Sequence, residues 1–97
     1  MALSEPELAT EVLKLLLSAK LERRDESVEK AADLARIDVP ALSSAATPRF
    51  EAYFAIATLG KALRNREEKT AIAERLEHAL SLTRRWIELA EQNTSAV

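Results

Sequence analysis

Apolar residues recur along the chain at the three- and four-residue spacing of amphipathic helices. The three prolines fall between these periodic segments or at their ends, and the single glycine, Gly60, lies inside one of them. This pattern predicts an all-α protein with four main helices and no strand. The expected helices span residues 5–21, 25–37, 48–64 and 66–92, with a linker at 38–47 and a frayed tail at 93–97.

Local signals at the predicted boundaries support these helices. Serine, threonine, asparagine and aspartate cap helix N-termini by accepting hydrogen bonds from the first free backbone N–H groups, and proline is favoured in the first turn. Asp25 can cap the second helix, and Pro40 follows its end. The other three start signals are Ser4 with Glu7, Thr47 with Pro48, and Asn65 with Glu68.

The third predicted helix is unusual because apolar residues surround it on nearly every side. These residues are Phe50, Tyr53, Phe54, Ile56 and Leu59. A helix of this kind is expected either in the middle of a domain or against a partner.

The other predicted helices each carry one core-facing stripe. The stripe of the fourth helix continues through either Trp86 or Ile87. The first helix also has a second apolar stripe, Leu13, Leu17 and Leu21, which points to an interface. The expected core residues are Leu8, Val12, Leu15, Leu16 and Ala19, then Val28, Ala31, Ala32 and Ala35, then Ile72, Leu76, Ala79, Leu80, Thr83 and Ala90.

Composition limits what such a chain can do. With 97 residues it is long enough for one domain with a thin core, but halves of this length would be too small to fold alone. The 14 basic and 16 acidic residues give a net charge of −2, so nucleic acid is not an expected partner. The absence of cysteine fits a reducing compartment, which makes the cytoplasm the expected location.

No segment predicts a signal peptide or a membrane span. Residues 1–11 hold three acidic and no basic residues, the opposite of a secretory leader. The uncharged stretch over residues 52–60 is far shorter than the roughly 20 residues that cross a bilayer. We therefore expect no membrane partner.

Residues that could support chemistry are few. His78 lies one turn after Glu74, but no further histidine or cysteine completes a metal or catalytic site, and we interpret the two as a surface pair. Gly60 has no second glycine for a phosphate-binding loop, and its small size is expected to let the third helix approach the fourth. The prediction is a protein that is not an enzyme and has no cofactor or metal.

The two halves of the chain repeat one another at an offset of 44 residues. The matched positions are Val12, Leu15, Leu16, Ala19, Val28, Ala32 and Ala35 with Ile56, Leu59, Gly60, Leu63, Ile72, Leu76 and Ala79. A recurring helix hairpin that cannot bury its apolar face alone is typical of helical repeat proteins. The second copy resembles a tetratricopeptide repeat in its Leu59-Gly60 pair and in the spacing of the apolar residues that follow.

The resemblance implies that the first helix of each hairpin lines a concave groove for a peptide. Transferred position by position, the groove residues are Thr10, Leu13, Leu17, Lys20 and Leu21 from the first hairpin, and Phe54, Ala57, Lys61, Arg64 and Asn65 from the second. The second stripe on the first helix, found independently, includes three of them. We expect Leu13, Leu17, Leu21, Phe54 and Ala57 to bind a partner, with Lys20, Lys61 and Arg64 at the rim.

The sequence thus predicts two stacked helix hairpins, either as a tetratricopeptide-like array or as a compact four-helix bundle. Its expected function is that of a non-catalytic adaptor or chaperone that captures an apolar segment of a protein partner. The alternatives are an immunity-protein-like or antitoxin-like inhibitor, a self-associating structural protein or homodimer, and an enzyme with a site around Glu74 and His78. High salt separates the first two, because it weakens a charged interface and spares an apolar one.

Overall fold

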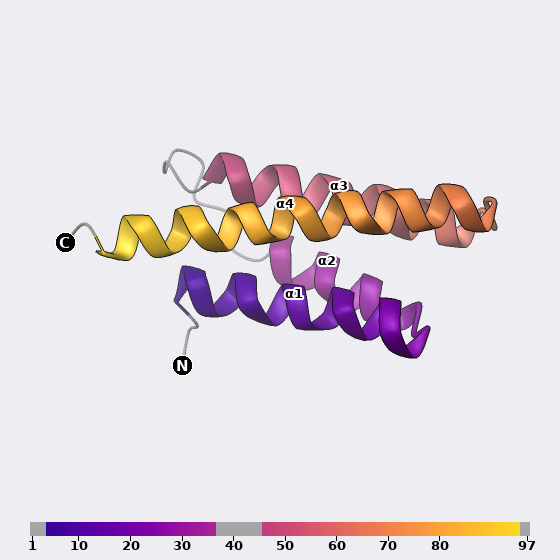
Figure 1. Cartoon of the computed structure of the whole chain (residues 1–97), viewed down its shortest axis with the longest axis horizontal. Helices are drawn as coiled ribbons and strands as arrows, with labels where there is room; N and C mark the ends of the chain where they lie inside the picture. The colour runs from indigo at the N-terminus through magenta and orange to yellow at the C-terminus, as the bar shows by residue number, and fades with distance from the viewer. Residues whose placement is uncertain (1–3, 37–45, 96–97) are drawn as a thin grey trace.

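The computed structural model describes residues 4–36 and 46–95, and all regular structure in these ranges is helical (Figure 1). The all-α fold class is therefore confirmed. The helices are α1 (Glu5–Glu22), α2 (Glu26–Arg36), α3 (Ala46–Arg64) and α4 (Lys69–Ser95).

Consecutive helices run antiparallel, so that α1 begins and α4 ends at the same end of the molecule (Figure 1). Both α1 and α3 pack against α2 and α4, whereas the diagonal pairs, α1 with α3 and α2 with α4, make at most marginal contact. The helices form a closed ring 44 × 22 × 20 Å in extent. Of the two predicted arrangements, this is the compact four-helix bundle.

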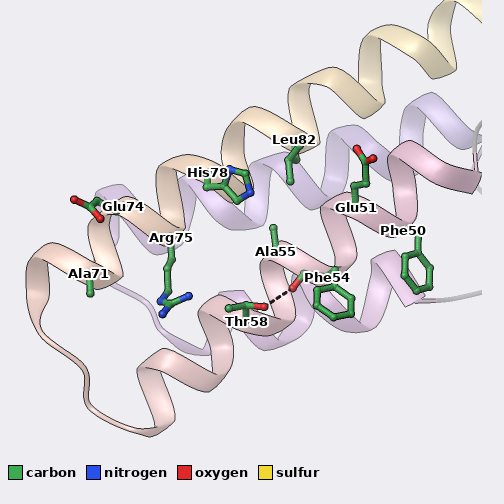
Figure 2. Close-up of a pocket in the computed structure, with 10 residues that line it drawn as sticks. All are labelled: Phe50, Glu51, Phe54, Ala55, Thr58, Ala71, Glu74, Arg75, His78 and Leu82. Carbon is green, nitrogen blue, oxygen red and sulfur yellow. Dashed lines mark hydrogen bonds between the residues drawn. The ribbon is translucent and has the colours of Figure 1, made fainter.

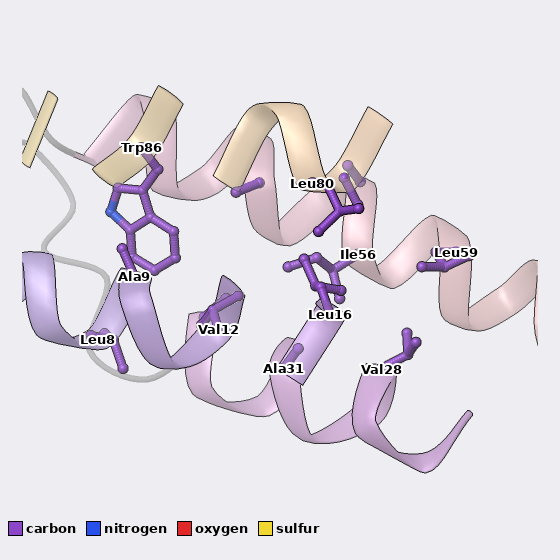
Figure 3. Packing of buried hydrophobic residues seen from close by; sticks show 14 of the residues in the cluster. Leu8, Ala9, Val12, Leu16, Val28, Ala31, Ile56, Leu59, Leu80 and Trp86 are labelled. Carbon is purple, nitrogen blue, oxygen red and sulfur yellow. The ribbon is translucent and has the colours of Figure 1, made fainter. Parts of the chain in front are cut away.

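The core lies where the inward stripes of the helices meet. Leu16, Ile56 and Leu80 are fully buried at its centre, and Val28 is the buried residue that α2 adds beside them (Figure 3). The predicted stripe of α4 is confirmed. Of the two residues through which it was expected to continue, Trp86 and Ile87, Trp86 is the fully buried one.

Two helix starts differ from the prediction. α3 begins at Ala46, so Thr47 is a residue of the helix and not the residue that precedes it. α4 begins at Lys69 and not near Asn65, because the chain at Arg66 turns into the left-handed conformation with φ of 53°. There the Arg66 N–H donates to the Leu63 carbonyl at 3.2 Å, and the next N–H donates to the Ala62 carbonyl at 3.1 Å. These bonds form a Schellman motif, so the residues expected to open α4 close α3 instead.

The other boundaries agree with the prediction or fall outside the described residues. Ser4 caps α1, accepting a hydrogen bond from the Glu7 N–H at 3.3 Å, with proline in the first turn. α4 continues to Ser95, into the segment predicted to be frayed. Most of the predicted linker, residues 38–45, lies outside the described part of the chain.

The bundle is closed at one end by a buried arginine. α2 has only 11 residues, so near its C-terminus α1, α3 and α4 come together around Arg49, whose side chain is 3% exposed. Its Nη1 pairs with Glu5 Oε2 at 3.3 Å, and its Nε donates to the Ala35 carbonyl at 2.9 Å. The other Glu5 oxygen accepts from the Trp86 indole N–H at 3.0 Å, and the guanidinium lies 5.7 Å from the Trp86 ring centroid. One side chain thus links all four helices.

Replacing Arg49 with methionine should lower the free energy of unfolding by about 2–3 kcal/mol. This is below the ~3–5 kcal/mol typical of breaking a buried pair, because Glu5 keeps partial access to water. The measurement is urea denaturation followed by Trp86 fluorescence. Arg64→Met is the matched control, since Arg64 is exposed and its 3.9 Å pair with Glu29 is worth less than ~0.5 kcal/mol. Equal losses in the two variants would contradict the role given to Arg49.

Gly60 lies against α2 and not against α4 as predicted. A β-carbon built at Gly60 would lie 3.8 Å from Val28 Cγ1 and 3.6 Å from Arg64 Nη1, which are ordinary contact distances. Gly60→Ala should therefore stabilise the protein by about 0.5–1 kcal/mol, because alanine loses less backbone entropy in a helix. Gly60→Leu should destabilise it by overpacking. Thermal unfolding of both variants tests this, and a lower melting temperature for Gly60→Ala would refute it.

Candidate functional site

The residues predicted to bind a partner lie on separate faces of the bundle. On α1, Leu13 and Leu17 are half-buried and pack against the core, so these two residues of the stripe are used in the fold itself. Lys20 forms an ion pair with Glu77 of α4. Leu21, near the end of α1, is 76% exposed. The stripe of α1 is thus mainly part of the packing of the bundle.

The predicted partner-binding residues on α3 do not all line the same hollow. Phe54 is exposed and lines a groove between α3 and α4, whereas Ala57 and Arg64 line a smaller hollow of about 280 Å³ between α2 and α3. Lys61 is exposed on the same helix. α1 and α3 lie diagonally in the ring, so in the described part of the chain these two helices are not neighbours that could form one groove between them.

The orientation of α3 about its own axis determines which of its apolar residues remain uncovered. Arg49, Ala52, Ile56 and Leu59 face the bundle interior and are buried. With these positions inside, an α-helix of 3.6 residues per turn turns residues 50, 54 and 58 outward. The outward row therefore begins with two phenylalanines.

A wide hollow lies in the groove between α3 and α4 (Figure 2). Its volume is about 820 Å³. Residues from α3 line one side and residues from α4 the other. The lining residues are Phe50, Glu51, Phe54, Ala55 and Thr58 from α3, and Ala71, Glu74, Arg75, His78 and Leu82 from α4.

Exposed aromatic rings distinguish this groove from the rest of the surface. The chain has two phenylalanines, and both are exposed here, Phe50 by 54% and Phe54 by 61%. Their ring centroids lie 6.2 Å apart, and Tyr53 stands edge-on to Phe50 at 6.5 Å. Contiguous exposed aromatic surface of this kind is typical of interaction sites.

Polar groups are unevenly placed along the groove (Figure 2). Glu51 lies at the end that holds the phenylalanines, and Arg75 lies at the other end, above Thr58. Arg75 Nη2 donates to Glu67 Oε1 at 3.3 Å, while its Nε is buried and has no hydrogen-bond partner among the described residues. The groove therefore carries the Glu51 carboxylate at one end, and the Arg75 guanidinium together with the Glu74 carboxylate at the other.

The groove offers contact surface more than chemistry. His78 and Glu74 both line it and are exposed. Within residues 4–36 and 46–95, no three histidine, cysteine, aspartate or glutamate side chains gather as metal ligands would. In the same ranges no helix has both the length and the apolar run needed to cross a bilayer.

Comparisons with protein-family models, with curated proteins and with solved structures find no match to this chain. The resemblance to tetratricopeptide repeats therefore stays a prediction based on the sequence.

The sequence analysis predicts Phe54 as a partner-binding residue, but in a different groove, shared with the first helix, and it does not predict the neighbours that Phe54 has here. Phe50 was assigned to the apolar third helix, and Glu74 and His78 were considered only as a pair on α4. The signal that could have found the site was the distribution of apolar residues around the axis of α3, since they lie on two opposite faces of the helix. Choosing the outer face required knowing that Arg49 points inward.

The ion pair between Lys20 and Glu77 leads to a prediction about pH. The hydrogen bond from Lys20, and then its positive charge, lower the pKa of Glu77 below the ordinary value. This contribution to stability is therefore present above the unfolded-state pKa and lost as the pH falls through the folded-state value. Lys20→Met should raise the Glu77 pKa toward normal in a carboxyl NMR titration. Lys14→Met should leave it unchanged, and an unaltered Glu77 pKa in Lys20→Met would disprove the contact.

Proposed function

We propose that this chain is a non-catalytic protein-binding module that docks an apolar helical segment of a protein partner in the groove between α3 and α4. Adaptors and chaperones use surfaces of this kind, and the cysteine-free composition suits a module that works in the cytoplasm. The surface differs from the one expected from the repeat resemblance, because it is formed by α3 with α4 and not by α1 with α3.

The observation that carries this proposal is the exposure of both phenylalanines on a helix that is apolar on nearly every side. Burying the exposed half of each ring would contribute on the order of 1 kcal/mol per ring to binding. Aromatic residues at the centre of an interface commonly dominate its energy. The groove itself matches the recognition mode in which an amphipathic helix lies in an apolar channel.

A photo-cross-linking experiment tests the proposal. With p-benzoylphenylalanine in place of Phe54, irradiation in cells of the source organism should give a discrete protein adduct that a peptide map can identify. The same group at Lys30, which is exposed on α2, is the control and should give none. Adducts absent at residue 54, or equal at both positions, would reject a protein-binding groove.

A second measurement separates binding from folding. In the double variant Phe50→Ser, Phe54→Ser, the free energy of unfolding should change by less than ~1 kcal/mol, because both rings are already largely in water. A groove-facing photo-cross-linker at Thr58 should then lose its adduct in this background. An adduct that persists would mean that the phenylalanines are not the contact surface.

A further inference from the structure

The groove between α3 and α4 is complementary to itself in shape. One end carries the projecting rings of Phe50 and Phe54, whereas the other end has no aromatic ring and holds the small side chains of Thr58 and Ala71 beside Glu74 and Arg75 (Figure 2). A second groove laid over the first in the opposite direction would place the projecting rings of each copy over the small residues of the other.

Two charged residues of the groove are placed in the same complementary way. Glu51 lies at the aromatic end and Arg75 at the small-residue end, with Ala55 between them (Figure 2). A two-fold axis crossing the groove near Ala55 would bring Glu51 of each copy to Arg75 of the other. The same contact would then form twice, as a closed two-fold interface requires. Arg75 has donors left for it, since its side chain is 42% exposed and only its Nη2 is engaged in the described chain, by Glu67.

The size of the surface suits such a dimer. α3 has 19 residues and is therefore about 28 Å long at ~1.5 Å per residue. The bundle measures 44 × 22 × 20 Å, so a lengthwise face can supply the ~800 Å² that each partner buries in a typical stable interface. Two copies of α3 and α4 would form a second four-helix core, in which Phe50 and Phe54 become interior residues.

We propose that the groove between α3 and α4 is occupied by the same groove of a second copy of this chain, packed antiparallel about a two-fold axis. Glu51 and Arg75 pair across the interface at both ends. This inference rests on the proposed protein-binding function and names its partner. A helix from a different protein would need only an apolar face to fit this groove. Only a two-fold dimer would form the contact between Glu51 and Arg75 twice.

Charge reversal tests the pairing. The variants Glu51→Arg and Arg75→Glu each place like charges at both ends of a homodimer, so each should raise the dimer dissociation constant by about tenfold or more. An equimolar mixture of the two restores both opposite-charge pairs, and so does the double variant. The dimer should return in both cases. Light scattering and sedimentation over a wide concentration range measure this, with circular dichroism to confirm folding.

Lys14→Glu is the matched control for Arg75→Glu. It removes an exposed 3.3 Å ion pair with Glu11, comparable with the 3.3 Å pair between Arg75 and Glu67, but it lies on α1 away from the groove. It should leave the dimer intact. Phe54→Glu, which adds a charge at an exposed position, should give a folded monomer.

Two outcomes would overturn this inference. One is a wild-type protein that stays monomeric up to ~1 mM, a concentration at which even weak association is measurable. The other is a dimer that neither Phe54→Glu nor the charge reversals weaken. If the cross-linker at residue 54 still captures a different protein in these cases, the proposed function stands without the dimer. If it captures neither another protein nor a second copy, both proposals fail.

Discussion

The buried guanidinium of Arg49 is the contact on which the geometry of this small bundle depends. It binds a carboxylate on α1, the Ala35 carbonyl at the end of α2 and the face of Trp86 on α4, while it belongs to the first turns of α3. The Ala35 carbonyl lies in the last turn of α2, where carbonyls have no partner within the helix. A charged group therefore satisfies a helix end that would otherwise lack a partner away from water.

The same contact fixes the rotation of α3. With Arg49 directed inward, the residues at helical spacing from it, Ala52, Ile56 and Leu59, also enter the core. The neighbouring Phe50 must then point outward, and Phe54 follows one turn later. The exposed aromatic surface is thus a direct consequence of the buried charge, since rotating α3 to hide the rings would carry Arg49 toward solvent and break its contacts.

Periodicity and capping signals were sufficient for the existence and type of all four helices. They were less reliable at boundaries, because Asn65 and Arg66 look like a helix start but form the end of α3, with an arginine in the left-handed position where glycine is usual. Arg49 gave no sequence signal, since one basic residue near a helix start is ordinary. The apolar stripes were visible, but the sequence does not say which of them the bundle covers. Leu13 and Leu17 pack against the core, whereas Phe50 and Phe54 stay exposed in the described chain.

A ring of four helices gives each helix two neighbours, and this limits how much apolar surface each can bury. α1 has two apolar stripes and can use both, because α2 lies on one side and the long α4 on the other. α3 has the same two neighbours but is apolar on nearly every side, so one face has no partner within the ring. The sequence analysis allowed such a helix two places, the middle of the domain or an interface. Because α3 lies at a corner of the ring, the outward face with Phe50 and Phe54 is the surface that the proposed interface would cover.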